Sequence, residues 1–395
     1  MKIVHVTQFF APIGGIEQYI LNLLPLLSAK GIENVVVYWA NHPRTLPAGT
    51  HPVHQITAAN IPAFVAKQRP DVVYLHAVRE PSLITALTGR WQTLAYVHDF
   101  HLVCPGLAKY FYRWGTGICQ RPYGLGCVPN IYWHRCATAK NPVSVYRIMK
   151  QVKDYLAAHR QLSGLLVASS YMRQLLIQNG LEPGRVHLLP HFTVMPAVPP
   201  PFPAGGPPTL LYVGRLEHEK GLPVLFRALG QLVATPFQLL IAGEGSRRVE
   251  YEAMVSQLGL TGRVQFLGWL APAGLEQAYR QAHCLVLPAV WPEPFGMVGI
   301  DAFGYARPVI AFNVGGISDW LQDGYNGFLV PPQDETQLTN RLQILLTTPT
   351  LAAEMGRNGR LHAETHHRPE QHLNQLLKLS THAHSLPLHL VSLSG

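Results

Sequence analysis

The residues best suited to chemistry lie in two short loops in the second half of the chain. Arg215 and Lys220 stand at the two ends of one loop, which is framed by glycines and enters a helical pattern. Two cations beside a helix N-terminus can clamp a diphosphate; a solvated surface loop is the alternative. Glu293 lies between two prolines where another helical pattern begins. A carboxylate there, beside free backbone amides, can hold sugar hydroxyls and a phosphate together; a helix-capping role is the alternative.

Three weaker features accompany these loops. Asp301 lies one to two turns into the helix that follows Glu293, either on the same side or at a solvated position. Gly243 belongs to a second glycine turn, which lacks a cation. Gly14 and Gly15 follow the first strand-like run and open a helical pattern, where free N–H groups favour a phosphate or a sugar hydroxyl. A plain tight turn is the alternative for this glycine pair.

The loops are positioned by a repeated alternation of β-branched runs and helical patterns. This alternation predicts βαβ units on parallel sheets, and ligands of such sheets bind beyond the carboxyl ends of the strands. The strand-like runs are 3–7, 35–39, 72–75, 93–97 and 165–168 in the first half, and 209–213, 238–242, 264–267, 284–287 and 308–312 in the second.

A proline-rich segment divides the chain into two α/β domains. Residues 194–208 contain too many prolines for a helix or a central strand, so we expect a linker. The predicted domains are 1–193, with a cysteine-rich insertion at 104–140, and 209–366, followed by a helix and tail at 367–395. We expect two Rossmann-like, doubly wound domains that face each other across a cleft.

Composition excludes several classes of protein. The chain has 395 residues, of which 48% are hydrophobic and 13% charged, so it is not a disordered chain. No apolar stretch reaches the roughly 18 residues of a membrane span, and the first ten residues are typical of a strand and not of a signal peptide. Residues 1–200 carry 18 Lys and Arg against 7 Asp and Glu, whereas residues 201–395 carry 13 against 15. This asymmetry indicates an anionic partner for the first half, or compositional drift.

Four cysteines gather in the insertion. Their spacing lacks the Cys-x2-Cys pairs of common zinc ribbons, so free thiols are the favoured interpretation and a structural zinc site the minor one. Five cysteines in a chain of this length favour a reducing compartment over a disulfide scaffold. The following stretch, 141–160, combines an apolar helical stripe with four cations, which predicts a packed helix or, alternatively, a helix lying on an anionic membrane. The four cysteines are Cys104, Cys119, Cys127 and Cys136.

Seven segments in this order resemble the family 4 glycosyltransferases, which have the GT-B architecture. The resemblance covers nearly the whole chain. Each segment is weak evidence alone, whereas all seven in register are strong evidence. The segments are GG (14–15), VHDFHLVCP (97–105), VASSYMR (167–173), GRLEHEKG (214–221), FLG (266–268), PEPFG (292–296) and VGG (314–316).

The resemblance implies transfer of a sugar from a nucleotide diphosphate sugar with retention of anomeric configuration and without a bound metal or other cofactor. Arg215 and Lys220 would neutralise the departing diphosphate, and His98 would face the donor sugar. Glu293 resembles the first Glu of the family's Glu-x7-Glu motif. The second Glu, which grips the ribose, is replaced by Asp301, whose shorter side chain predicts a longer or water-bridged contact.

The remaining expected site residues lie at or after the ends of predicted strands or belong to these segments. Those expected at the acceptor are Gly14, Gln18, His76 and Asp99. Those expected at the donor, as backbone or packing contacts, are Gly15, Gly214, Gly243, Leu267, Gly268, Phe295, Gly296, Met297 and Val298. The helix after residue 367 would cross back to the first domain, as in the family.

We therefore expect a retaining glycosyltransferase of the hexosyltransferase type, either free in the cytoplasm or at the inner face of the membrane. It would move a sugar from a UDP- or GDP-sugar to a glycan or lipid-linked acceptor in cell-surface polysaccharide or glycolipid biosynthesis. The anionic partner would be this acceptor or its membrane, and no nucleic acid is expected. Alternatives are another GT-B enzyme, of the epimerase or phosphorylase type, and a non-catalytic sugar- or nucleic-acid-binding protein.

Overall fold

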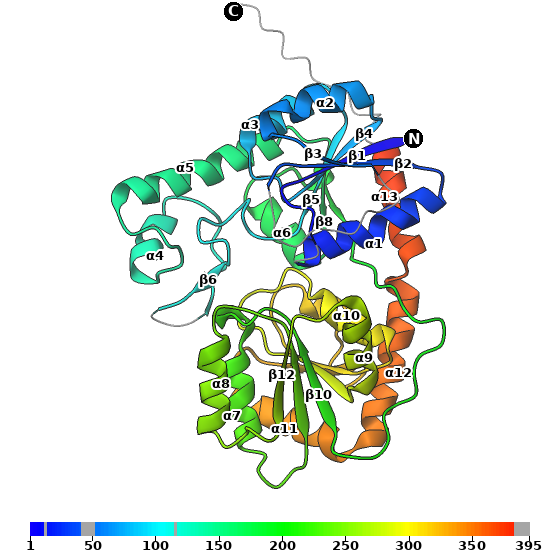
Figure 1. The fold of residues 1–395 in the computed structure, drawn as a ribbon. Coiled ribbons are helices and arrows are strands. Elements are labelled where there is room, and N and C mark those ends of the chain that lie inside the picture. Colours follow the sequence, from blue (N-terminus) through cyan, green and yellow to red (C-terminus); the bar gives the residue numbers. More distant parts are fainter. Residues whose placement is uncertain (12–13, 41–51, 114–116, 383–395) are drawn as a thin grey trace, which may run out of the picture. The chain divides into compact units, whose positions relative to one another are not determined.

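The computed structural model describes residues 1–11, 14–40, 52–113 and 117–382, which form two compact units (Figure 1). The first unit contains Met1–Ala108, Arg121–Pro190 and the chain from Pro369 onward. The second contains Lys109–Gln120 and His191–Arg368. These boundaries differ from the expected ones in two places: residues 109–120 group with the second unit, and so does the whole proline-rich segment.

The first unit is built on one parallel sheet. Within the described residues its strand order is β3-β2-β1-β4-β5-β8-β9. The central strands are buried along their whole length, as expected of a sheet covered on both faces. The strands are β1 (Lys2–Thr7), β2 (Glu33–Tyr38), β3 (Val53–Gln55), β4 (Val72–His76), β5 (Thr93–Val97), β8 (Gly164–Val167) and β9 (Val186–Leu188).

Helices of the first unit connect these strands. Two of them begin at side-chain caps, because Asn141 and Ser169 accept hydrogen bonds from the backbone N–H groups of Ser144 and Met172. The last helix, α13, packs against α1. The helices are α1 (Gly15–Ala29), α2 (Ile61–Gln68), α3 (Pro81–Thr88), α4 (Cys127–Trp133), α5 (Pro142–His159), α6 (Ser170–Gln178) and α13 (Pro369–His382).

The second unit repeats the scheme with the strand order β12-β11-β10-β13-β14-β15 in its described part. The order reverses between β10 and β13, the kind of position where open α/β sheets bind ligands. A short antiparallel pair, β6 (Tyr110–Phe111) and β7 (Gly117–Ile118), also belongs to this unit. The strands of the sheet are β10 (Thr209–Val213), β11 (Gln238–Ala242), β12 (Val264–Gly268), β13 (Cys284–Leu287), β14 (Val309–Phe312) and β15 (Gly327–Val330).

Helices cover both faces of the second sheet. In Figure 1, α7 and α8 lie on one side of it, and α9, α10 and α12 on the other. Within the described residues, no helix of either unit combines the length and the apolar character needed to cross a membrane. The helices of this unit are α7 (Leu222–Gly230), α8 (Arg248–Gln257), α9 (Pro272–Gln281), α10 (Met297–Gly304), α11 (Glu335–Thr347) and α12 (Pro349–His366).

Two buried arginines fix the proline-rich segment to the second unit. Arg307 donates to the carbonyl of Pro201 over 2.9 Å, and Arg360 donates to the carbonyl of Pro196 over 2.9 Å. Both guanidinium groups also donate to carbonyls in the core of the unit. The segment is therefore held in place by backbone acceptors, which a sequence prediction from proline content cannot anticipate.

A buried network of aromatic and histidine side chains ties α13 to the first sheet. The Tyr19 hydroxyl lies 2.8 Å from Nε2 of His372 and 3.1 Å from the Tyr74 hydroxyl. His372 donates from Nδ1 to the carbonyl of Pro190 at 2.7 Å, so its Nε2 is the acceptor for Tyr19. Burial lowers the pKa of His372 to about 4. His372 is therefore a neutral imidazole in the folded protein at physiological pH.

The network predicts acid destabilisation of the first unit. In the unfolded chain His372 takes up its proton near pH 6.5, whereas in the folded protein it does so only near pH 4. The free energy of unfolding therefore falls as the pH drops from 6.5 to 4, and this group causes no further loss below pH 4. The loss attributable to this group is about 3 kcal/mol. Unfolding midpoints measured from pH 7.5 to 4 should fall less steeply in His372→Gln than in the wild type. The matched control His54→Gln, on an edge strand, should keep the wild-type slope; equal slopes for all three proteins would contradict the assignment.

Candidate functional site

Close backbone packing brings the two predicted loops together. Gly221 has a φ of +72° and lies so close to the loop after β13 that a Cβ there would be 1.8 Å from the carbonyl oxygen of Pro288. The backbone N–H of Val290 donates to the carbonyl of Glu219 over 3.0 Å. Only glycine permits both this conformation and this approach. The turn at His218–Lys220 is thereby held against the segment that carries Glu293.

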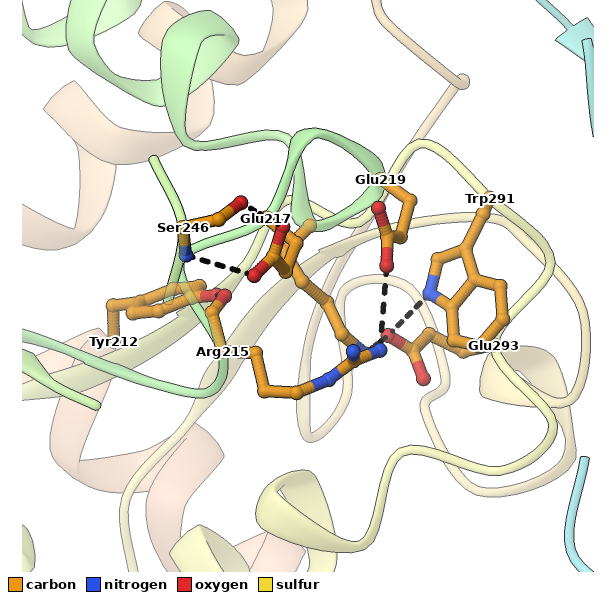
Figure 2. Close-up of polar contacts among 8 residues, drawn as sticks. Tyr212, Arg215, Glu217, Glu219, Ser246, Trp291 and Glu293 are labelled. Carbon is orange, nitrogen blue, oxygen red and sulfur yellow. Dashed lines mark hydrogen bonds and ion pairs between the residues drawn. The ribbon is translucent and has the colours of Figure 1, made fainter. Parts of the chain in front are cut away.

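At the centre of this junction, Lys220 and Glu293 form a buried ion pair. The Lys220 ammonium donates to Oε1 of Glu293, and the two side chains are only 15% and 7% exposed. Trp291 donates from its indole N–H to the same oxygen over 2.8 Å, as Figure 2 shows. The Lys220 nitrogen also lies 4.8 Å from the centre of the Trp291 ring. Sequence reasoning missed Trp291, although its place two residues before Glu293 was a usable signal.

Arg215 lies at the more open side of the same loop. Its guanidinium is 61% exposed and pairs with Glu219 at 3.3 Å. Glu217 points the other way and accepts from the backbone N–H and hydroxyl of Ser246 (Figure 2). Tyr212 donates to the carbonyl of Arg215 over 2.7 Å. Both expected cations are thus present at the site, and each is balanced by a carboxylate.

The glycines predicted at the donor site meet at the carboxyl ends of β10, β11 and β12. A Cβ on Gly243 would lie 1.9 Å from the carbonyl oxygen of Gly214. The N–H of Gly243 donates to the carbonyl of Gly268 over 2.8 Å. Leu267, next to Gly268, is half-buried at the end of β12. These backbones form one continuous edge beside the Arg215 loop.

The segment after Glu293 is shaped by a second close contact. The backbone carbonyl of Glu293 accepts from the N–H of Gly316 over 2.8 Å, and a Cβ on Gly315 would lie 2.1 Å from the same oxygen. Gly296, with a φ of +84°, then caps α10. Met297 and Val298 begin this helix half-buried, where amides have no acceptor within the helix.

Two predicted donor residues of this segment also make side-chain contacts within the second unit. Phe295 is buried edge-on against His191 and His367, so only its backbone can contact a ligand. Asp301 accepts from the Thr193 hydroxyl over 2.6 Å, and burial raises its pKa to about 6. The structure brings Asp301 to the residue 193 segment of the same unit, which the sequence did not indicate.

The predicted residues of the first unit divide into exposed and buried groups. Gly14, Gly15 and Gln18 are exposed at the start of α1. His98 is half-buried and stacks on Tyr96 with ring centres 4.5 Å apart, and burial lowers its pKa to about 3. It is therefore a neutral imidazole at physiological pH.

His76 is a correction to the expected acceptor contacts. Its side chain is fully buried, and its Nε2 lies 3.2 Å from Nδ1 of His5 in the core of the sheet. Burial lowers the pKa of His76 well below its usual value. Strand-end position suggested a ligand contact, but the side chain of the last residue of β4 points into the core.

Asp99 is the anchor of an ion-pair cluster that sequence reasoning did not foresee. Its carboxylate accepts from Nη2 of Arg79 over 2.9 Å and from both the backbone N–H and Nδ1 of His101. Although burial opposes it, His101 and Arg79 hold the pKa of Asp99 well below its usual range. Arg79 follows β4 by three residues, so the strand-end rule could have found it.

The cysteines of the insertion do not converge. None of the chain's five cysteines, all of them in the described residues, forms a disulfide. Across the described ranges, no three His, Cys, Asp or Glu side chains gather in a group that could hold a metal ion. Cys104 belongs to the first unit and Cys119 to the second. The zinc hypothesis therefore gains no support.

The chain is similar to proteins that are named as glycosyltransferases. Residues 199–362 match the family model described as glycosyl transferases group 1. The chain is 26% identical over 388 residues to a D-inositol 3-phosphate glycosyltransferase of Acidothermus cellulolyticus, which covers 90% of this chain and 82% of that protein.

Solved structures resemble the chain along nearly its whole length. A sucrose-phosphate synthase of Thermosynechococcus elongatus superposes with a TM-score of 0.76 at 22% identity, over 98% of this chain and 100% of that one. Anabaena HepE in complex with UDP-glucose gives a TM-score of 0.71 at 17% identity, over 97% and 100%. With its two parallel-sheet units, the chain has the GT-B fold, and this prediction is confirmed.

The junction predicts a specific role for the Trp291 indole in stability. Trp291→Phe keeps a ring near Lys220 but removes the N–H that Glu293 accepts, and a buried carboxylate that loses a donor costs about 1–3 kcal/mol. Chemical denaturation of the purified protein should show this loss. Trp269→Phe, at a half-exposed tryptophan of the same unit, is the control and should change stability by less than about 0.5 kcal/mol. Equal effects of the two substitutions would show that the hydrogen bond is unimportant.

Proposed function

We propose that this chain, a glycosyltransferase with the GT-B fold, transfers a sugar from a nucleotide diphosphate sugar to a hydroxyl of a glycan or lipid-linked acceptor. The observation that carries the proposal is the buried cluster of Lys220, Glu293 and Trp291, beside the exposed cation Arg215. A buried carboxylate and ammonium at a strand-end junction are costly to maintain for structure alone. They suit a ligand that carries both phosphate charge and hydroxyl groups.

The charge balance of the cluster suggests how the donor would bind. Lys220 is neutralised by Glu293, and Arg215 by Glu219. A diphosphate would compete with these carboxylates for the two cations. Glu293, released in part from Lys220, would then accept hydrogen bonds from hydroxyls of the donor sugar, while Trp291 keeps its carboxylate in place. The amides at the start of α10, at Gly296–Val298, would complete the phosphate contacts.

The same groups would assist the reaction. As the bond between the sugar's C1 and the phosphate oxygen breaks, negative charge grows on the diphosphate, and Arg215 and Lys220 stabilise it. We propose that these two cations do so without a bound metal. In the retaining course implied by the family resemblance, the acceptor oxygen bonds to C1 on the face that the phosphate leaves. Its proton passes to the departing phosphate oxygen.

The nucleotide would lie along the glycine edge of the second unit. Gly214, Gly243 and Gly268 bring three backbones close together there, with Leu267 beside them. Asp301 remains the proposed ribose contact, in a site where Thr193 already holds its carboxylate. The complex of Anabaena HepE with UDP-glucose supports a UDP-sugar as the first donor to test, with a GDP-sugar as the second.

The first unit would serve the acceptor. We retain the exposed helix start Gly14–Gln18 and His98 as proposed substrate contacts. Asp99, expected at the acceptor, would act there through Arg79 and His101, which its carboxylate holds, and His76 is omitted because it is buried. The resemblance favours an acceptor used in cell-surface polysaccharide or glycolipid assembly.

The exposed face of the α4–α5 region supports peripheral contact with an anionic membrane. Leu125, Trp133, Val143 and Tyr146 are largely exposed there. Residues 121–153, which belong to the first unit, contain six Lys and Arg but no Asp or Glu. One face of α5 is packed, as the sequence favoured, so membrane contact would use its other face. In liposome flotation, binding should require acidic lipids; binding that is indifferent to lipid charge would contradict it.

Activity tests the donor site directly. A thermal-shift panel of UDP-, GDP- and ADP-sugars identifies the donor, and Lys220→Ala and Glu293→Ala should then each lower turnover by about 100-fold or more. Glu276→Ala, which removes an exposed carboxylate on α9 of the same unit, should keep wild-type turnover. Wild-type turnover in both site variants would overturn the assignment.

A further inference from the structure

A cavity of about 220 Å³ lies within the first unit, apart from the donor residues. It is enclosed by the segments that follow β4 and β5 and by one side of α5. Apolar walls come from Cys104, Ile148 and Val152, and the polar lining includes Arg79, His101 and Tyr155. A cavity with mostly apolar walls and a few fixed polar groups is typical of small-molecule sites.

The polar end of the cavity is built on groups that their neighbours hold in place. Asp99 holds both Nδ1 of His101 and Nη2 of Arg79. His101 is 3% exposed, and Tyr155 packs edge-on against it at 5.6 Å. The Tyr155 hydroxyl donates to the carbonyl of Arg79 over 2.5 Å, which fixes the arginine from the other side. The imidazole and guanidinium are therefore held in place before any ligand arrives.

Two nitrogens of this end lack a hydrogen-bond partner among the described residues. They are Nε2 of His101 and Nε of Arg79, and both are buried. Nδ1 of His101 faces the Asp99 carboxylate, so Nε2 accepts a hydrogen bond in a neutral ring and donates one in a charged ring. Arg79 Nε is always a donor. Buried polar groups are nearly always satisfied, so these two unmet nitrogens indicate a missing partner.

A hydroxyl group is the partner that satisfies both atoms. It can accept from Nε of Arg79 while it donates to Nε2 of a neutral His101 or accepts from Nε2 of a charged one. A phosphate fits less well, because Asp99 already balances the charge of Arg79. The Glu80 carboxyl, which interacts electrostatically with both Arg79 and His101, further disfavours an anion. The walls at Ile148 and Val152 suit the apolar face of a ring.

We propose that this cavity binds an uncharged sugar ring of the acceptor, with one ring hydroxyl bridging His101 and Arg79. His101 and Arg79 are then acceptor-binding residues, and Asp99 is a positioning residue that acts through them. The identification of the ring as the acceptor rests on the proposed function, whereas binding of the ring does not. The cations outside the cavity remain available to an anionic surface.

Ligand-detected NMR with the full chain tests the proposal. The probes are the methyl α-glycosides of glucose, galactose and mannose, with inorganic phosphate as the anionic probe. At least one glycoside should bind the wild type, and Ile148→Trp, which fills the cavity, should weaken it about tenfold or more. Ala157→Trp introduces the same side chain at an exposed position of α5 outside the cavity and should bind as the wild type does.

Two substitutions at His101 separate ligand binding from a merely structural role. His101→Gln can place an acceptor near Nε2 but loses the Asp99 bond, whereas His101→Asn keeps a group near Nδ1 and loses Nε2. The proposal predicts weaker glycoside binding by His101→Asn than by His101→Gln. A purely structural histidine predicts the reverse order, because only the Asp99 bond would matter. The reverse order, binding of phosphate alone, or no glycoside binding to the wild type would overturn the proposal.

These experiments distinguish failure of the cavity proposal from failure of the proposed function. Glycoside binding that is lost in Ile148→Trp, without transfer from any nucleotide sugar, would sustain the cavity and refute the transferase assignment. Transfer activity with an acceptor KM unaffected by Ile148→Trp would sustain the transferase and refute the cavity.

Discussion

The buried pair between Lys220 and Glu293 is the interaction on which the second unit's site depends. Two opposite charges withdrawn from water are tolerable only together, and removing either leaves the other uncompensated. Their meeting requires Gly221 to touch the loop after β13 and Gly315 to touch the backbone of Glu293. Trp291 completes the arrangement by donating to the shared oxygen. The glycines of these loops are therefore needed to bring the two charged side chains together in one buried junction.

The sequence patterns predicted which residues lie at the ends of the strands, but not how these residues contact one another. The alternation of strands and helices is local, so it placed Arg215, Lys220 and Glu293 at the ends of parallel strands. Pairing is not local: Lys220 and Glu293 are 73 residues apart, and their direct contact could not be read from either motif. For the same reason the buried position of His76 and the tethering of the proline-rich segment by Arg307 and Arg360 were missed. Each depends on partners from other elements of the fold.

The charge and the cavity of the first unit suggest two different kinds of ligand. Residues 121–153 contain six Lys and Arg but no Asp or Glu, in the same stretch as the exposed side chains of Leu125, Trp133, Val143 and Tyr146. In the cavity, Arg79 is balanced by Asp99, and two buried nitrogens lack a protein partner among the described residues. Under the proposed function, an anionic surface would meet the cations, and a sugar hydroxyl of the acceptor would meet the cavity.

We propose that Lys220 is shared between Glu293 and the diphosphate of the donor. The affinities for the nucleoside diphosphate and for the nucleotide sugar test this most directly. Calorimetric dissociation constants would be measured for the nucleoside diphosphate and for its sugar, in wild type and Glu293→Gln. Removing the carboxylate charge frees Lys220 but weakens the contacts to sugar hydroxyls. Glu293→Gln should therefore bind the free diphosphate more tightly than the wild type and the nucleotide sugar more weakly. Equal weakening of both ligands, or no change in either, would contradict the account.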